Sequence, residues 1–574
     1  MRLPRLTGLV SLALPLLALG QPTAPVTVAA SVSEPTSAAP FPVAIQVDAA
    51  KPVGPMKPIW RFFGADEPNY ATMKDGKKLI GQIGELRPKD TFFRTHNLLC
   101  TGDGTAALKW GSTNAYTEDA QENPIYDWKI LDEIFDTYLQ RGVRPYAQIG
   151  FMPKALSIQP EPYQHHWNPG LKYSDIITGW AYPPKDYDKW RELVYQWVKH
   201  CVERYGRAEV ETWYWEVWNE PNGSYWKASK EEFQKLHDYA VDGVRRALPS
   251  ARVGGPDVAG SGGKFMESFL DHLVNGTNYA TGAKGTPTDF LAFHAKGTPT
   301  FVDGHVRMGI ANQLRTIDDG FRMIAAIPEL KDKPIVIGES DPDGCAACQG
   351  PQLGYRNTTM YSSYTAASFA RKYQLMDKRG VNLDGALTWA FEFENEPWFA
   401  GFRVLATNGI TLPVFNVFRM FSHMGGERVA TTSSSEIPLA EIMKTGVRQK
   451  PDVAALASTE ARKLAILVWH YHDDDVPGPA ADVELAIAHL PAAASKDKLR
   501  VTRYLIDETH GNSFTAWKKM GSPAAPTSAQ YAELEAAGAL AQTTAPQLTR
   551  DADGTAKVSF PLSRQAVSLL VLEW

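Results

Sequence analysis

The segment TWYWEVWNEPN, residues 212–222, places a run of apolar and aromatic residues directly before Asn219 and Glu220. A short apolar run that ends at turn residues is typical of a buried β-strand. Pro221 fixes the backbone dihedral φ of the turn that follows. The segment therefore predicts a buried strand whose carboxyl end presents a carboxylate, and α/β barrels carry their chemistry at that end of the strands.

Seven further strand-like runs accompany this one, separated by amphipathic segments with helical spacing. The eight expected strands are 61–67, 90–99, 144–151, 212–219, 251–258, 289–295, 333–340 and 384–393. The expected helices include 126–142, 187–206, 230–248 and 360–380. This alternation predicts an α/β fold, a (β/α)8 TIM barrel. A doubly wound open sheet is the alternative, but it more often carries a glycine-rich phosphate loop after its first strand, which this sequence lacks.

After residue 412 the pattern changes to strands in which apolar and polar residues alternate. The expected strands are 464–474, 482–490, 499–507, 555–563 and 566–574. Alternation between turn residues predicts an accessory C-terminal β-sandwich domain. We expect the barrel over residues 59–411 and the β-sandwich over 42–58 together with 412–574, with the early strand 42–49 joining the sandwich.

The N-terminus has the features of a secretory signal peptide over residues 1–20. Arg2 and Arg5 precede a short apolar run, and small residues stand before a cut at Gln21. A membrane anchor is the alternative. Residues 21–41 are rich in Pro, Ala, Ser and Thr and predict a disordered linker. The protein is therefore expected to be exported, to the periplasm or outside the cell.

Composition narrows the classes of partner. The formal net charge of the 574-residue chain is −5, which favours neither nucleic acid nor a membrane surface as a partner. No His-x-x-x-His motif occurs, so we expect no metal and no other cofactor. A Gly-x-Ser-x-Gly motif is also absent, which argues against a serine hydrolase. The sequence leaves the oligomeric state open.

A second carboxylate ends another expected strand. KPIVIGES, residues 333–340, is the seventh strand, and Glu339 lies at its carboxyl end as Glu220 does on the fourth. Strands four and seven lie nearly opposite each other in an eight-stranded barrel, so the two carboxylates are expected to face each other. Cleavage of a glycosidic bond uses such a pair, one protonating the leaving oxygen and the other attacking the anomeric carbon or activating water.

An ordered set of motifs resembles glycoside hydrolase family 39, which holds β-xylosidases and α-L-iduronidases. The motifs are RTHNLL (94–99), QIGFMPKAL (148–156), WYWEVWNEPN (213–222), VGGPDVAG (253–260), FHAKG (293–297), IGES (337–340), LPVFNVFRMFSHM (412–424) and VTRYLIDETHGNSFTAW (501–517). The resemblance covers nearly all of the mature chain. It implies a retaining exo-glycosidase of the β-xylosidase type that acts on plant-polysaccharide fragments.

The resemblance also implies roles for individual residues. Glu220 is expected to be the general acid/base and Glu339 the nucleophile. The residues expected to contact the sugar are Asn219, His96, His294 and Trp389, together with Glu392 or Glu394. Glu216 lies on the same side of its strand as Glu220 but deeper in the barrel, so we expect it to be a buried, paired structural residue.

Lys296 marks a departure from the family pattern. The β-xylosidase members usually read H-A-Y after strand six, whereas this chain reads H-A-K. In the family the tyrosine steadies the nucleophile, and an ammonium group favours an ionised carboxylate more strongly. The ammonium group would otherwise meet an anionic substrate group, which favours a uronic acid. A lysine turned to solvent is the third possibility.

The alternatives that remain are a hydrolase of another glycoside, such as a uronide or an arabinoside, and a non-catalytic glycan-binding protein. The last class would have lost one carboxylate, and this chain keeps both. Cys345 and Cys348 form C-A-A-C in the loop after strand seven. In an exported protein this spacing favours a local disulfide, with free thiols as the alternative.

Overall fold

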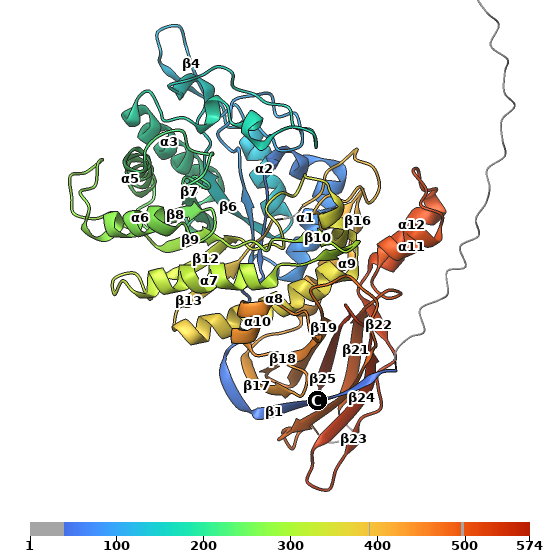
Figure 1. Ribbon diagram of the computed structural model, residues 1–574. Coiled ribbons are helices and arrows are strands. Elements are labelled where there is room, and N and C mark those ends of the chain that lie inside the picture. The colour runs from blue at the N-terminus through green and yellow to red at the C-terminus, as the bar shows by residue number, and fades with distance from the viewer. Residues whose placement is uncertain (1–38, 390, 495–498) are drawn as a thin grey trace, which may run out of the picture. The chain divides into compact units, whose positions relative to one another are not determined.

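The computed structural model describes residues 39–389, 391–494 and 499–574 (Figure 1). The expected signal peptide and nearly all of the expected linker, residues 1–38, lie outside the described residues. Within the described ranges no helix is both long and apolar enough to cross a membrane.

Nine parallel strand segments form one sheet in the order β13-β12-β9-β8-β7-β6-β3-β2-β14. They are β2 (Phe62–Ala65), β3 (Thr91–Thr95), β6 (Val143–Ile149), β7 (Tyr214–Val217), β8 (Arg252–Val258), β9 (Phe290–His294), β12 (Pro334–Glu339), β13 (Asn382–Ala386) and β14 (Thr388–Trp389). The eighth strand is interrupted at Leu387, so β13 pairs with β12 and β14 pairs with β2. This pairing brings the two ends of the sheet together, and the expected TIM barrel is confirmed.

Helices separate the barrel strands and lie outside them in Figure 1. The helices of this part are α1 (Lys74–Leu86), α2 (Lys129–Gln140), α3 (Tyr187–Tyr205), α4 (Arg207–Val210), α5 (Lys230–Ala247), α6 (Gly263–Asn275), α7 (Ile310–Ala325), α8 (Thr359–Arg379) and α9 (Pro413–Ser422). Short 3-10 helices are η1 (Pro68–Thr72), η2 (Lys154–Leu156), η3 (Tyr173–Ile176), η4 (Gly179–Ala181) and η5 (Pro351–Asn357). The four helices expected from sequence are confirmed within three residues at each end.

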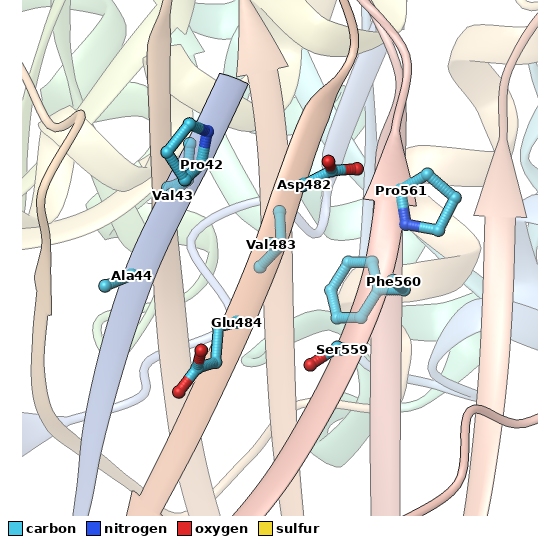
Figure 2. Close-up of a pocket in the computed structure, with 9 residues that line it drawn as sticks. All are labelled: Pro42, Val43, Ala44, Asp482, Val483, Glu484, Ser559, Phe560 and Pro561. Carbon is cyan, nitrogen blue, oxygen red and sulfur yellow. The ribbon is translucent and has the colours of Figure 1, made fainter. Parts of the chain in front are cut away.

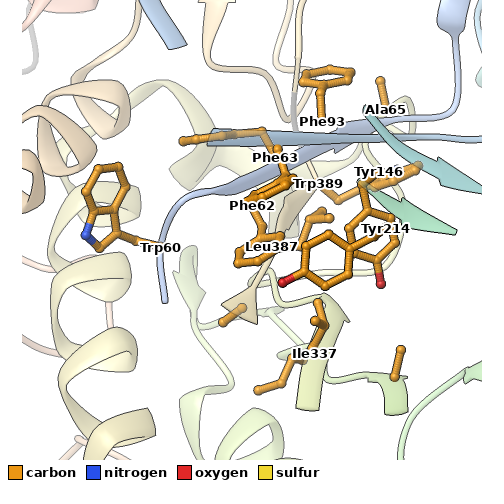
Figure 3. Packing of buried hydrophobic residues seen from close by; sticks show 14 of the residues in the cluster. Trp60, Phe62, Phe63, Ala65, Phe93, Tyr146, Tyr214, Ile337, Leu387 and Trp389 are labelled. Carbon is orange, nitrogen blue, oxygen red and sulfur yellow. The ribbon is translucent and has the colours of Figure 1, made fainter. Parts of the chain in front are cut away.

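Aromatic side chains fill the barrel interior (Figure 3). The rings of Tyr146 and Tyr214 stack with centroids 4.9 Å apart, and Phe62 meets Tyr214 edge-on at 5.5 Å. Every residue of β2, β3, β7 and β9 is buried, as expected for strands covered on both faces. These packed rings lie inside the barrel and support the strands whose carboxyl ends carry the candidate site.

A second sheet of ten strands forms the C-terminal part, in the order β22-β21-β25-β19-β18-β17-β1-β20-β24-β23. The strands are β1 (Phe41–Pro55), β17 (Glu427–Ser433), β18 (Asp452–Glu460), β19 (Lys463–Tyr471), β20 (Ala481–Ala488), β21 (Arg500–Ile506), β22 (Ala541–Thr543), β23 (Thr549–Arg550), β24 (Ala556–Leu562) and β25 (Val567–Glu573). The early strand β1 joins this sheet between β17 and β20, as expected. Hydrogen bonds link all ten strands in one order, and division into the two layers of a sandwich stays a prediction.

The remaining elements are short. Three hairpins are β4 (Tyr116–Glu118) with β5 (Pro124–Tyr126), β10 (Thr300–Val302) with β11 (His305–Arg307), and β15 (Ala406–Thr407) with β16 (Ile410–Thr411). The C-terminal helices are α10 (Leu439–Thr445), α11 (Ser513–Lys519) and α12 (Ser528–Gly538). Residue 412, the expected start of the second domain, is followed by helix α9, whose Phe418 packs edge-on against Phe63 of the barrel strand β2.

Candidate active site

The two carboxylates expected from sequence both lie at carboxyl ends of barrel strands. Glu339 is the last residue of β12, and its side chain is 8% exposed. Glu220 follows β7 by three residues, and its side chain is 25% exposed. The backbone N–H of Glu220 donates to the carbonyl oxygen of Asp257 at 2.9 Å. One carboxylate is therefore buried and the other partly open, so the two have different environments.

His294, the last residue of β9, lies between these two carboxylates. Its Nδ1 is 2.8 Å from Oε1 of Glu220 and 3.8 Å from Oε2 of Glu339. The two carboxylate oxygens can be no farther apart than the sum of these distances. That bound on one pair of oxygens lies near the lower limit of the about 6.5–9.5 Å between the carboxyl groups of inverting glycosidases, and it is compatible with the about 5–5.5 Å of retaining ones.

Asp257 of β8 sets the charge of His294. Its Oδ2 forms an ion pair with Nε2 of His294 at 2.9 Å, and both side chains are buried. Burial alone would lower the pKa of His294, but Asp257 and Glu339 raise it to about 10. His294 is therefore an imidazolium at neutral pH, and its Nδ1–H donates to Glu220.

Glu339 lies among positive charges. The ammonium group of Lys296 forms an ion pair with its Oε2 at 2.6 Å, and Nη1 of Arg94 is 3.6 Å from its Oε1. Burial would raise the pKa of Glu339, but His294, Lys296 and Arg94 together hold that pKa well below its usual range. The carboxylate is ionised across the physiological range, as a nucleophile must be.

Lys296 follows β9 by two residues and turns inward. Besides Glu339, its ammonium group donates to Oδ2 of Asp341 at 2.6 Å, and its side chain is 15% exposed. The solvent-facing alternative for Lys296 does not fit these contacts. Asp341 in turn accepts from the backbone N–H of Trp389 at 2.9 Å and pairs with Arg403, so Lys296 links the nucleophile to the end of the eighth strand.

Arg94 of β3 joins the groups beneath the two carboxylates. Its Nε donates to Glu216 at 2.5 Å, its Nη2 donates to Oδ1 of Asn219 at 2.9 Å, and it also pairs with Asp257. All three partners are buried. Glu216 also accepts from the hydroxyl of Tyr146 at 2.7 Å. Glu216 is therefore the buried, paired group expected from sequence, and Asn219 is held beside the acid residue.

His96 and Trp389 lie on the Glu339 side of the site. The two rings have centroids 4.3 Å apart, and Nε2 of His96 is 3.9 Å from Oε1 of Glu339. Nδ1 of His96 is 2.8 Å from Oδ1 of Asp66, which is also paired with Lys109. Burial and the adjacent Arg94 lower the pKa of His96, which leaves its imidazole neutral. Trp389 is the last residue of β14, on the eighth strand as expected.

The match to a family of known proteins agrees with this geometry. The model of the family described as glycosyl hydrolases family 39 matches residues 43–554. The chain belongs to glycosyl hydrolases family 39. It is therefore a glycoside hydrolase, which acts on glycoside substrates.

Relatives of this family 39 chain have two kinds of name. A β-xylosidase from Geobacillus stearothermophilus is 27% identical over 475 residues, covering 79% of this chain and 82% of the relative. An α-L-iduronidase from Mus musculus is 24% identical over 550 residues, covering 88% and 77%. The crystal structure of a family 39 enzyme from Xanthomonas axonopodis pv. citri has a TM-score of 0.69 at 22% identity, covering 94% of this chain and 98% of the other. That structure supports the fold.

Glu392 and Glu394, the other expected sugar contacts of this family 39 hydrolase, have different partners. Glu394 accepts from the backbone N–H groups of Asp75 and Gly76, at 2.5 and 3.0 Å, and so caps helix α1. Glu392 accepts from the backbone N–H of Gly409 at 2.5 Å. Burial raises the pKa of Glu392 to about 8. The contacts described for these two residues do not join them to Glu220 or Glu339.

Three charged residues of the site were missed by sequence reasoning: Arg94, Asp257 and Asp341. Arg94 and Asp257 lie inside the quoted motifs RTHNLL and VGGPDVAG, at buried positions of β3 and β8. A charged residue among the apolar residues of an expected strand is the signal that would have found them, because a buried charge needs a partner. Asp341 follows Glu339 by two residues, and nothing in its own sequence neighbourhood marks it.

Cys345 and Cys348 form a disulfide in the loop after β12, as favoured from sequence. Elsewhere in the described residues, no group of three or more His, Cys, Asp or Glu side chains is arranged to hold a metal ion. A shallow cavity of about 440 Å³ lies on strands β1, β20 and β24 of the ten-stranded sheet (Figure 2). Its lining includes Asp482, Glu484 and Ser559 but none of the site residues, so it is separate from the glycosidase chemistry.

Proposed function

We propose that this protein is a retaining exo-glycosidase of the β-xylosidase type that releases sugars from plant-polysaccharide oligosaccharides. The observation that carries the proposal is that one imidazole, His294, contacts carboxylates from strands four and seven. In this proposal Glu339 attacks the anomeric carbon while Glu220 protonates the leaving oxygen. Glu220 then takes a proton from the water that releases the sugar from the glycosyl-enzyme intermediate.

The remaining residues have supporting roles in this proposal. Asn219, fixed by Arg94, is placed to hold the hydroxyl next to the reacting carbon. His96 and His294 contact the sugar, and Trp389 forms the apolar floor beneath it. Relatives named as β-xylosidases support xylose as the sugar.

A second candidate is hydrolysis of a uronide, since other relatives are named as α-L-iduronidases. Lys296 is the residue that would meet a uronate carboxylate. Its ammonium group already lies 2.6 Å from each of two carboxylates, Glu339 and Asp341. Because these partners already neutralise its charge, the geometry supports a role in steadying the nucleophile. An arabinoside remains a third substrate class, and a screen of aryl glycosides with xylosyl, arabinosyl and uronosyl groups separates the three.

Two variants test the roles of the carboxylates. Glu339→Ala should abolish turnover of every substrate. Glu220→Ala should keep activity on substrates with excellent leaving groups, which need no proton, and azide should rescue it with a β-glycosyl azide product. The configuration of the first product, followed by NMR, tests retention. An α-configured first product from a β-glycoside would contradict both retention and this assignment of roles.

We also propose that the protein is exported, on the basis of the N-terminal sequence. Fractionation of producing cells should find the activity in the periplasm or medium, and N-terminal sequencing should place the mature end at Gln21. Activity confined to the cytoplasmic fraction would contradict this proposal.

A further inference from the structure

Asp257 is a buried carboxylate without an assigned role in the glycosidase reaction. Its side chain is fully buried, and its backbone φ is +52°, an uncommon conformation for a residue other than glycine. A β-carbon on Gly338, the residue before the nucleophile, would collide with the carboxylate of Asp257. The chain thus keeps a glycine next to Glu339, which leaves room for this charge. Such an arrangement is costly unless the charge serves a purpose.

Two contacts connect Asp257 to the acid residue Glu220. Its carbonyl oxygen accepts from the backbone N–H of Glu220 at 2.9 Å. Its carboxylate pairs with Nε2 of His294 at 2.9 Å, and Nδ1 of the same ring is 2.8 Å from Oε1 of Glu220. The main-chain and side-chain contacts close a ring from Asp257 through His294 to Glu220 and back.

The contact between Asp257 and His294 is an ion pair rather than an aligned hydrogen bond, so Asp257 acts on the ring through its charge. The groups that face His294 are Asp257 from β8, Glu220 from the loop after β7 and Glu339 from β12. Arg94 from β3 pairs with Asp257, and Lys296 pairs with Glu339. Of the three carboxylates, Asp257 is the one that does not take part in the proposed reaction.

We propose that Asp257 is a positioning residue for the acid/base Glu220: its charge keeps His294 protonated, and the Nδ1–H of His294 is thereby directed onto Glu220. This inference rests on the proposed function of Glu220. When Glu220 must act as an acid, the Nδ1 proton moves to Oε1 and from there to the leaving oxygen, and a neutral imidazole remains with its proton on Nε2 beside Asp257. When Glu220 later takes a proton from water, it returns that proton to Nδ1. His294 and Glu220 therefore share one exchangeable proton, which they give to the leaving oxygen in the first step and regain from water in the second.

The variant Asp257→Asn tests the inference, because it keeps the shape of the side chain and removes its charge. The alkaline limb of the pH profile of kcat/KM should move to lower pH by about one unit or more, since an opposite charge at this distance shifts a pKa by that amount. Activity on substrates with poor leaving groups should fall by about tenfold or more, because these substrates need the proton that a general acid supplies. Activity on dinitrophenyl glycosides should fall less, because dinitrophenolate leaves without a proton.

Glu216→Gln is the matched control. Glu216 is a buried carboxylate on the same Arg94, and its other described contact is the hydroxyl of Tyr146. This variant should keep the wild-type ratio between poor and good leaving groups and the wild-type alkaline limb. If Asp257→Asn behaves as this control does, Asp257 is a structural residue and the inference is wrong.

A measurement on the wild-type enzyme covers the case in which Asp257→Asn does not fold. Histidine ¹⁵N NMR, with His294→Gln to assign the signal, should show both ring nitrogens of His294 protonated above pH 8. Deprotonation near pH 6.5 would overturn the inference, since that is the pKa of an unperturbed histidine. The NMR titration does not depend on the role of Glu220. Failure of Glu220→Ala to show leaving-group dependence would instead contradict the proposed function.

Discussion

At the scale of single residues, the site works because each carboxylate is given a different electrostatic environment. Glu339 is buried among cations, which hold its pKa well below the usual range. Glu220 is partly exposed and accepts one hydrogen bond from His294. These different environments suit the separate tasks of the proposed mechanism, in which Glu339 stays ionised and Glu220 exchanges a proton.

Lys296→Met should lower kcat/KM by about tenfold or more, the scale of losing a charge-assisted hydrogen bond. Lys296 is one of the cations that lower the pKa of Glu339, so its loss raises that pKa. Because Glu339 must be ionised to attack, the acid limb of the pH profile should move to higher pH. Kinetics from pH 3 to pH 8 on neutral and charged glycosides measure both effects.

The exposed Lys284 provides a control for removing a lysine charge. Lys284→Met should leave the acid limb and kcat/KM unchanged. Full activity of Lys296→Met on every glycoside would show that the ion pair with Glu339 does not support catalysis. A loss confined to uronosyl substrates would instead favour the uronide candidate.

Residue types and strand positions predicted Glu220, Glu339 and His294, because each lies at the end of a strand or just beyond it and within a recognisable motif. The contacts among Arg94, Asp257 and Glu216 were not predictable in the same way. These three residues lie on β3, β7 and β8. Their buried side chains meet because closure of the barrel fixes how these strands are aligned, and a sequence pattern does not show that alignment. Glu392 and Glu394 show the converse, since a position just past strand eight did not reveal that Glu394 caps α1.

At the scale of elements, the barrel strands and the amphipathic helices could be read from sequence, whereas elements without a clear apolar pattern could not. The expected eighth strand, 384–393, is broken into β13 and β14, because one strand must pair with β12 and then with β2. Helix α12 was missed because SAQYAELEAAG has no apolar face, and its buried residues are Leu534 and Gly538. Strand β17 was missed because ERVATTS is largely polar.

The loop after β12 is held by Arg356 as well as by the disulfide. The guanidinium group of Arg356 donates to the carbonyl oxygens of Cys345 and Cys348, each at 2.6 Å, and to Asp343 at 2.9 Å. A disulfide that closes so short a loop contributes about 2 kcal/mol or less in the chain-entropy model. Arg356 is therefore expected to fix this loop more strongly than the disulfide.

A Cys345→Ser/Cys348→Ser variant should change KM by a small factor and leave the unfolding midpoint nearly unchanged, because Arg356 still holds the loop. Arg356→Gln should cost more in both activity and stability, since it leaves the buried Asp343 without that guanidinium partner. Mass spectrometry after alkylation without reductant should find both cysteines unmodified. Labelling of both cysteines, or a larger effect from the double variant than from Arg356→Gln, would contradict this account.

At the scale of the whole chain, the barrel and the ten-stranded sheet share buried polar contacts. Arg371 of α8 donates two hydrogen bonds to Asp452 of β18, at 2.9 and 2.8 Å, and one to Glu436 at 2.6 Å. Asp452 also accepts from the indole N–H of Trp469. Arg371 is 1% exposed and Asp452 is fully buried. Both parts are therefore expected to unfold together, although no pattern in the sequence indicated which helix would meet which strand.

Arg371→Met should destabilise the protein by about 3–5 kcal/mol, because it leaves a buried carboxylate without its cation. The loss should lower the urea midpoint measured by tryptophan fluorescence, while kcat/KM below the transition stays close to wild type, since Arg371 makes none of the described contacts with Glu220 or Glu339.

Arg322→Met is the control, because Arg322 and Asp319 form an exposed pair with side chains 56% and 57% exposed. Exposed pairs contribute little to stability, so this variant should match wild type. Equal midpoints for the two variants would show that the Arg371–Asp452 pair does not stabilise the junction between barrel and sheet, and two separate transitions in wild type would show that the parts unfold independently.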